Sequence, residues 1–118
     1  MPPYTKAHLT DCERNGDWSL VRRSLGVEAF GINLVTIPPG ASIPQHDEVE
    51  RDQEEVFFVV RGDPTVVVDG EDIPAPEGTF VRVDVEPKRT VRNDGGRPAS
   101  VLIVSAPRSS GYKPMSWG

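Results

Sequence analysis

Residues 40–62 read GASIPQHDEVERDQEEVFFVVRG. Gly40 is followed after five residues by His46, and Glu55 is followed after six residues by Gly62. The last part, EVFFVVR, is rich in β-branched and aromatic residues and is apolar on both faces of an extended chain, which is typical of a central, buried strand. The segment therefore predicts an acidic loop that carries one histidine and leads directly into a core strand.

The rest of the chain predicts more short strands joined by tight turns. Eleven glycines and twelve prolines are spread along the sequence instead of being clustered. Asp69-Gly70 is a strong hairpin signal, and Pro76-Glu77-Gly78 predicts a second turn. We expect an all-β fold of about seven to nine strands without a long helix. Besides the strand after Glu55, strands are predicted at 29–37, 65–69, 79–83, 88–92 and 100–106.

With 118 residues the chain is long enough for one domain with a modest core. We expect an N-terminal arm with a lead-in strand over residues 1–28, a barrel over 29–106 and a C-terminal tail over 107–118. The tail contains Tyr112, Met115 and Trp117, which predicts that it packs on another surface.

Composition excludes several classes of function. The net charge of −5 argues against a nucleic-acid-binding surface, which needs a basic patch. No apolar run approaches the roughly 20 residues of a membrane-spanning helix, and residues 1–11 do not resemble a signal peptide. A single cysteine cannot form an internal disulfide, so we expect a cytoplasmic protein.

Two motifs along the chain together resemble the cupin superfamily, whose members are small jelly-roll (double-stranded β-helix) barrels. The first motif of that family, G-x5-H-x-H-x3–4-E-x6-G, has counterparts here in Gly40, His46, Glu55 and Gly62. The second, G-x5-P-x-G-x2-H-x3-N, has counterparts in Gly70, Pro76, Gly78 and Asn93. The resemblance covers about residues 29–106 and implies a single conserved barrel of the type-2 kind.

The chain departs from the family pattern at positions that bind metal there. Glu48 stands where a second histidine is expected, and Arg89 replaces the histidine of the second motif. The resemblance implies a divalent metal (iron, manganese, zinc or nickel), for which His46, Glu48 and Glu55 remain as ligands. A guanidinium has no free lone pair and cannot ligate a metal, but it can pair with a glutamate. We therefore expect an internal ion pair and no metal cofactor.

Three functions stay open at this stage. The favoured one is a barrel that binds a small molecule without a catalytic metal, with Phe57 and Phe80 lining an apolar interior and His46, Glu48, Glu55 and Arg89 at one end. The second is a metal-dependent dioxygenase or isomerase that uses the histidine and both glutamates. The third is a metal-free isomerase or cyclase in which His46 is the base and Arg89 the electrophile.

We also expect a homodimer. A small barrel has exposed sheet edges and a limited core, and pairing with a second copy covers both. Small cupins are often dimers, and the resemblance implies that the arm before Asp17 and the aromatic tail contribute to the interface.

Overall fold

The computed structural model describes residues 2–118, which form two antiparallel β-sheets with little helix. The strands within this range are β1 (Arg14–Asn15), β2 (Trp18–Ser19), β3 (Gly31–Ile37), β4 (Gln53–Arg61), β5 (Thr65–Val68), β6 (Glu71–Pro74), β7 (Phe80–Val83), β8 (Arg89–Arg92) and β9 (Ala99–Pro107). A 3-10 turn, η1 (Leu9–Asp11), and the short helix α1 (Val21–Leu25) precede β3.

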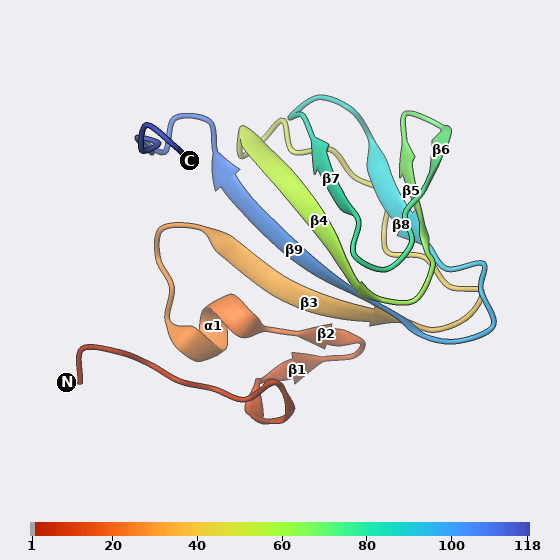
Figure 1. The fold of residues 1–118 in the computed structure, drawn as a ribbon, viewed down its shortest axis with the longest axis horizontal. Helices are drawn as coiled ribbons and strands as arrows, with labels where there is room; N and C mark the ends of the chain where they lie inside the picture. Colours follow the sequence, from red (N-terminus) through yellow and green to blue (C-terminus); the bar gives the residue numbers. More distant parts are fainter. Residues whose placement is uncertain (1) are drawn as a thin grey trace.

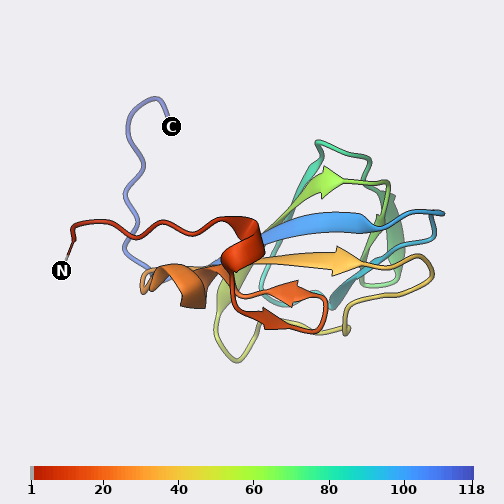
Figure 2. The same cartoon turned by 90° about the horizontal axis from the view of Figure 1, so that it is seen from below.

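The larger sheet has the strand order β1-β2-β3-β9-β4-β7, and the smaller sheet has the order β6-β5-β8. The long strands β3, β9 and β4 lie side by side, and the β5–β6 hairpin lies at one end of the molecule (Figure 1). Both chain ends lie at the opposite end (Figures 1 and 2). This arrangement is the jelly-roll barrel that the sequence predicts.

Residues 41–48 run beside β8 and extend the smaller sheet by isolated pairings. Ile43 N donates to Val91 O at 3.1 Å, and Glu48 N donates to Val85 O at 3.1 Å. His46 and Arg89 lie directly opposite each other, because each backbone N–H donates to the other residue's carbonyl, at 3.0 and 2.8 Å. The acidic loop is thereby held against the strand that carries Arg89.

The core lies between the two sheets and contains mainly β-branched side chains. Phe57 and its neighbours on β4 alternate between buried and less buried positions, as expected for a strand with one face inward. Each fully buried valine or phenylalanine contributes roughly 1.5–3 kcal/mol. The main buried members of this cluster are Val35, Ile37, Ile43, Phe57, Val59, Val66, Val83, Val91, Val101 and Ile103.

Motif residues outside the strands have structural roles. Gly62 has a φ of +88°, and a Cβ there would lie 2.9 Å from Ala99 Cα, so the turn after β4 requires glycine. The buried Asn93 follows β8, and its Nδ2 donates to Ile37 O and Arg97 O, each at 2.9 Å. Gly62 and Asn93 therefore hold the loops at the end of the barrel where Ile37 pairs with Ala99.

The strand predictions are confirmed, with two refinements. β4 is central, between β9 and β7, but its Val60 is exposed, so this strand is not buried on both faces. Residues 17–25, which the sequence leaves ambiguous between strand and helix, contain β2 and then α1, which ends at Gly26 in a left-handed conformation (φ +74°). No helix among residues 2–118 is long and apolar enough to cross a membrane.

Candidate functional site

The inward face of the larger sheet changes from apolar to polar along its length. Near the end where Ile37 of β3 pairs with Ala99 of β9, this face carries Ile37 and Val59. At the other end, Glu55 of β4 lies opposite Ser105 of β9, and Asn33 lies on β3. Polar side chains therefore gather at one end of the barrel interior.

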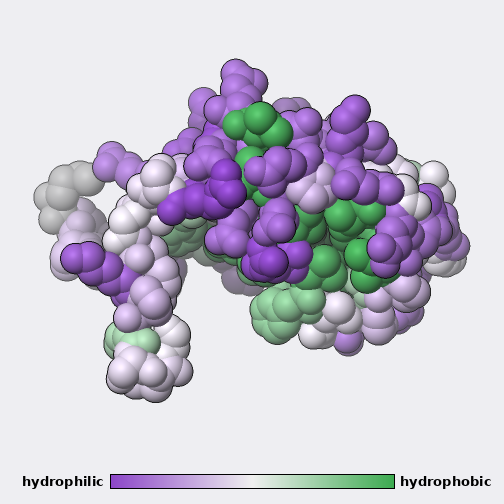
Figure 3. Space-filling view, turned by 90° about the horizontal axis from the view of Figure 1, so that it is seen from above, coloured by the Kyte–Doolittle hydropathy of each residue, from purple (hydrophilic) through white to green (hydrophobic). Residues whose placement is uncertain are grey.

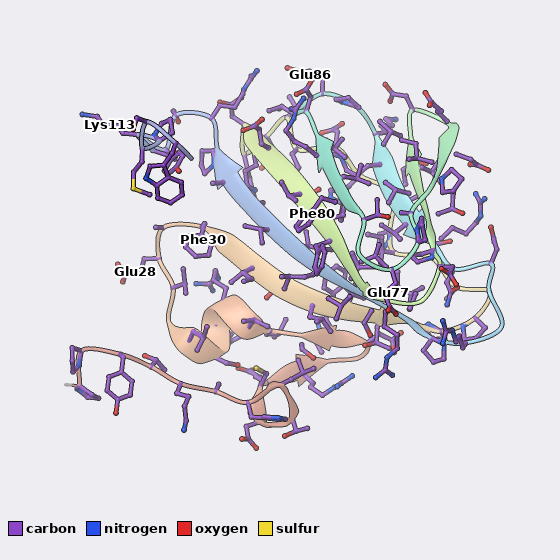
Figure 4. The ribbon with its side chains drawn as sticks, viewed as in Figure 1. Glu28, Phe30, Glu77, Phe80, Glu86 and Lys113 are labelled. Atoms are coloured by element: carbon purple, nitrogen blue, oxygen red, sulfur yellow. The ribbon has the colours of Figure 1, made fainter. Side chains whose placement is uncertain are left out.

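A pocket of about 630 Å³ opens at this polar end. Glu28 and Phe30, on the segment that leads into β3 (Figure 4), are exposed and line part of it. Its wall and floor combine aromatic, apolar, charged and amide side chains. They include Trp18, Arg22, Ile32, Asn33, His46, Glu48, Arg51, Gln53, Glu55, Ile103 and Ser105.

His46, Glu48 and Glu55 converge on the floor of this pocket. The His46 Nε2 atom lies 3.4 Å from Glu48 Oε1 and 3.5 Å from Glu55 Oε1. The other ring nitrogen, Nδ1, lies 3.1 Å from Pro44 O and must carry a hydrogen to bond with that carbonyl. Gln53 Nε2 donates to Glu48 Oε2 at 3.3 Å, so this carboxylate is also oriented by a neighbour.

The three groups have pKa values shifted in different directions. The hydrogen bond with Glu55 raises the pKa of the His46 imidazole above its ordinary value of 6.5, although burial opposes it. Burial, and then the charge of Glu55, raise the pKa of Glu48 above 4.5. Burial would also raise the pKa of Glu55, but hydrogen bonds with His46 and Arg89 outweigh it and lower that pKa below 4.5. The lowered pKa of Glu55 favours its ionised form.

Arg89 holds Glu55 in this state from the opposite sheet. Its side chain is 0% exposed, and its Nη1 donates to Glu55 Oε1 at 2.8 Å. Its Nε donates to Pro87 O at 3.0 Å, and its Nη2 donates to the carbonyls of Asp84 and Val85. The guanidinium is therefore an internal counter-ion for Glu55. Its hydrogen bonds to Asp84 and Val85 also hold the loop between β7 and β8.

The donor set fits a divalent ion in part. Ligand atoms of His46, Glu48 and Glu55 all lie within 4.8 Å of one another, and an imidazole with two carboxylates suits a borderline metal. However, Glu55 Oε1 already accepts from Arg89, and this permanent cation is the residue that stands at the fourth ligand position of the sequence motif. Three protein ligands are therefore available, and Arg89 already neutralises part of the negative charge of the two carboxylates.

The structure brings together four of the six residues that the sequence singles out. His46, Glu48 and Glu55 meet in the pocket, and Arg89 lies directly behind Glu55. The expectation that Phe80 lines the interior is wrong, because β7 turns this side chain outward, where it is 69% exposed and stacks on Phe58. Phe57 does face inward, but it is packed in the core and does not line the pocket.

Other polar residues of the pocket were missed by sequence reasoning. Asn33, Gln53 and Ser105 line it, and all three have odd numbers on β3, β4 and β9. Side chains two apart on a strand share a face, so the register of Glu55 could have identified Gln53. Asn33 and Ser105 could be identified as pocket residues only from the pairing of β3 and β4 with β9, which the sequence does not reveal.

Comparison with known families and structures agrees with this architecture. The model of the Cupin domain matches residues 33–105. No curated protein matches the chain significantly in sequence. A cupin protein from Bacteroides fragilis is 20% identical, with a TM-score of 0.82 over 99% of this chain and 94% of that chain.

Two further similar structures have been given enzymatic names. One is a sugar phosphate isomerase from a cupin superfamily, from Silicibacter pomeroyi, with a TM-score of 0.66, 25% identity, and coverage of 75% of this chain and 57% of that one. The other is a predicted oxalate decarboxylase from Thermotoga maritima, with a TM-score of 0.60, 21% identity and coverage of 64% of both chains. The matched domain spans more than half of the chain and contains both motifs, so the protein belongs to the cupin family.

Proposed function

We propose that this cupin binds a small polar molecule in the pocket at the open end of the barrel, without a catalytic metal. The observation that carries the proposal is the convergence of His46, Glu48 and Glu55 on the floor of a cavity of about 630 Å³. Cavities of roughly 300–1,000 Å³ with a few converging polar groups are typical small-molecule sites.

The lining favours a ligand with several hydrogen-bond donors. Glu48 and Glu55 present carboxylate oxygens, which are acceptors, and Asn33 and Ser105 can both accept and donate. Hydroxyl or ammonium groups of the ligand would satisfy these acceptors. Arg22 and Arg51 line the same pocket and suit an anionic group on the ligand, while Trp18 offers an apolar wall.

A screen of polar fragments tests this function. Sugar alcohols, sugar acids and hydroxylated amino acids would be added to the protein, and binding followed by NMR and by the shift in unfolding temperature. We expect ligands that perturb the His46 ring signals and bind at least about tenfold more weakly to Glu48→Gln.

Glu54→Gln is the matched control, since Glu54 lies on β4 beside Glu55 but points outward, with its side chain 49% exposed against 7%. This variant should keep the wild-type affinity. Ligands that bind both variants as tightly as the wild type, or that perturb only residues outside the pocket, would contradict the proposal.

The second candidate is a metal-dependent cupin enzyme, and the spacing of the three possible ligand atoms favours it. His46, Glu48 and Glu55 would hold the ion, which would supply Lewis-acid chemistry. Calorimetric titration of untagged protein with Mn²⁺, Zn²⁺ and Ni²⁺ separates the candidates. Near-stoichiometric binding that His46→Gln abolishes would replace the metal-free proposal, whereas an absence of binding would support it.

A further inference from the structure

Most arginine side chains of this protein are neutralised by its own acidic groups. The arginines that form an ion pair with a carboxylate are Arg23, Arg82, Arg89, Arg92, Arg97 and Arg108. Within residues 2–118, the arginines that form no such pair are Arg14, Arg22, Arg51 and Arg61. Arg22 and Arg51 line the candidate pocket, and we call them the pocket arginines. Guanidinium groups without a counter-ion therefore border the cavity that contains the polar floor.

Arg22 is held in place by the turn that follows its helix. It lies on α1 and is exposed. Its Nη1 donates to Val27 O at 3.1 Å, and its own carbonyl accepts from Gly26 N and Val27 N at 2.8 and 3.1 Å. A guanidinium carries five N–H groups, and the bond to Val27 uses only one of them. The other N–H groups of Arg22 are therefore available to a molecule in the pocket.

Arg51 lies in the acidic loop, yet it forms no ion pair with the acids of that loop. The loop turns between Glu48 and Gln53, since Gln53 N donates to Glu48 O at 3.3 Å. The next residue, Asp52, accepts from Arg108 instead, and Glu48 accepts from Gln53. Burial raises the pKa of Glu48, and the charge of Arg51 is among those that oppose this shift. The charge of Arg51 therefore acts on the floor of the pocket without being neutralised there.

The C-terminal tail does not neutralise the pocket arginines either. Residues 108–118 contain no aspartate or glutamate. The tail stands away from the body of the molecule (Figures 2 and 3). Its Tyr112, Met115 and Trp117 are exposed, so the packing that the sequence predicts for the tail is slight within residues 2–118. The charge of the pocket arginines is thus left for solvent ions or for a ligand.

The pocket offers two kinds of binding group. Glu48 and Glu55 accept hydrogen bonds, which suits the hydroxyl groups of a ligand. The pocket arginines suit an oxyanion, because the planar fork of a guanidinium matches a carboxylate or a phosphate. Trp18 lines the same pocket and suits a carbon chain. The lining therefore matches a molecule that carries both hydroxyl groups and an acidic group.

We propose that the ligand of this pocket is a small hydroxylated acid, and that the pocket arginines bind its carboxylate or phosphate group. The inference rests on the proposed function, because it names the ligand class of the same pocket. Hydroxyl groups of the ligand donate to Glu48 and Glu55, while its acidic group supplies the counter-ion that Arg22 and Arg51 lack. The pocket arginines are thus specificity residues that distinguish an acid from an uncharged sugar alcohol.

An acid can be attracted only by this local charge, because the chain as a whole repels it. The net charge is −5, and Glu28 lines the pocket in addition to the two acids of the floor. Hydrogen bonds to an ionised group are roughly twice as strong as those between neutral groups. Since the pocket arginines are exposed, dissolved salt screens them. Rising ionic strength should therefore weaken binding of the acid more than binding of a sugar alcohol.

Calorimetric titration with a matched set of ligands tests the inference. The set contains a sugar alcohol, the sugar acid with the same carbon chain, and the terminal phosphate of the alcohol, with four and with six carbons. We expect an acidic member to bind at least about tenfold more tightly than the alcohol of the same length. The tighter of the two acidic members identifies the group that the pocket arginines recognise.

Variants of the pocket arginines test whether they cause this preference. Arg22→Gln and Arg51→Gln should each lower the ratio of acid affinity to alcohol affinity at least about threefold, and the double variant should abolish the preference. A change in the shape of the pocket would weaken both ligands together and leave the ratio unchanged. Arg51→Lys keeps the charge without the fork, so it should retain part of the preference.

Arg61→Gln is the matched control. Arg61 is also exposed and without an ion pair, but it lies where β4 pairs with Ser100, outside the pocket. This variant changes the net charge by the same amount and should keep the full preference. A preference that survives the double variant, or that Arg61→Gln lowers equally, would overturn the inference. Equal affinity for acid and alcohol would overturn it too but leave the proposed function standing, whereas a lack of binding by the whole set would contradict both.

Discussion

The two ends of the barrel interior use the same strands for different purposes. Phe57 and Gln53 point to the same side of β4, four residues apart, yet one lies in the core and the other lines the pocket. At the packed end, β-branched and aromatic side chains fill the space between the sheets. At the open end, the same alternation presents the Glu55 carboxylate and the amides of Asn33 and Gln53 to a cavity, which residues 41–48 complete with His46 and Glu48. Core packing and the lining of the pocket are therefore separated along each strand.

Arg89 belongs to both regions. It pairs with the pocket residue Glu55, but it is itself fully buried beside the core on β8. Removing one partner of such a pair leaves an uncompensated charge inside the protein. The pocket thus depends on the core for the charge state of its most buried acid.

The largest expected effect is at the packed end. Phe57→Ala should lower the free energy of unfolding by about 3–5 kcal/mol, because it leaves a cavity in a fully buried cluster. Gln53→Ala, on the same face of the same strand but in the pocket, should cost less than about 1 kcal/mol. Urea unfolding followed by fluorescence measures both. Similar losses for the two variants would show that the two ends do not differ in packing.

The next effect concerns the pair that joins the regions. Arg89→Met should lower the free energy of unfolding by roughly 3 kcal/mol, since Glu55 would lose its buried counter-ion. The double variant Arg89→Met/Glu55→Gln should recover part of this loss, because the remaining amide carries no charge. If the double variant is no more stable than the single one, the clamp on the carbonyls of Asp84 and Val85 is the more important role of Arg89.

A smaller effect should appear as a pH dependence of stability. The folded state raises the pKa of His46 above 6.5, so its contribution is fully present below pH 6.5 and is lost as the pH rises through the folded value. The contribution should stay below about 1 kcal/mol, because solvent screens this half-exposed imidazole. Unfolding curves from pH 5 to pH 9 measure it, with His46→Gln as the reference. An unchanged slope in the variant would exclude His46 as its source.

The smallest effect is expected outside the barrel. Arg82 pairs with Glu54 and Asp84, but all three side chains are largely exposed. Arg82→Ala should leave the urea midpoint of the monomer unchanged, in contrast to Arg89→Met. A midpoint that falls as far as that of Arg89→Met would mean that burial does not distinguish the two arginines.

Much of the fold could be predicted because its signals are local. The β-rich run after Glu55 is β4, and Asp69-Gly70 joins β5 to β6 through residues with positive φ. The motif spacing also anticipated the meeting of His46, Glu48 and Glu55. Phe80 was placed on the wrong face, because a short strand with apolar residues on both sides does not reveal which one points inward.

The sequence by itself determined the jelly-roll class, the turns and the residue types at the motif positions, since backbone propensity and spacing act over a few residues. Only the tertiary structure decided which of these residues contact one another. It paired Arg89 with Glu55 from the opposite sheet, 34 positions away, and each of the three guanidinium nitrogens donates inside the protein. It also aligned Leu34, Leu102, Phe58 and Phe80 from four strands on the side of the larger sheet that faces away from the core. Both outcomes depend on register between distant strands, which no local pattern specifies.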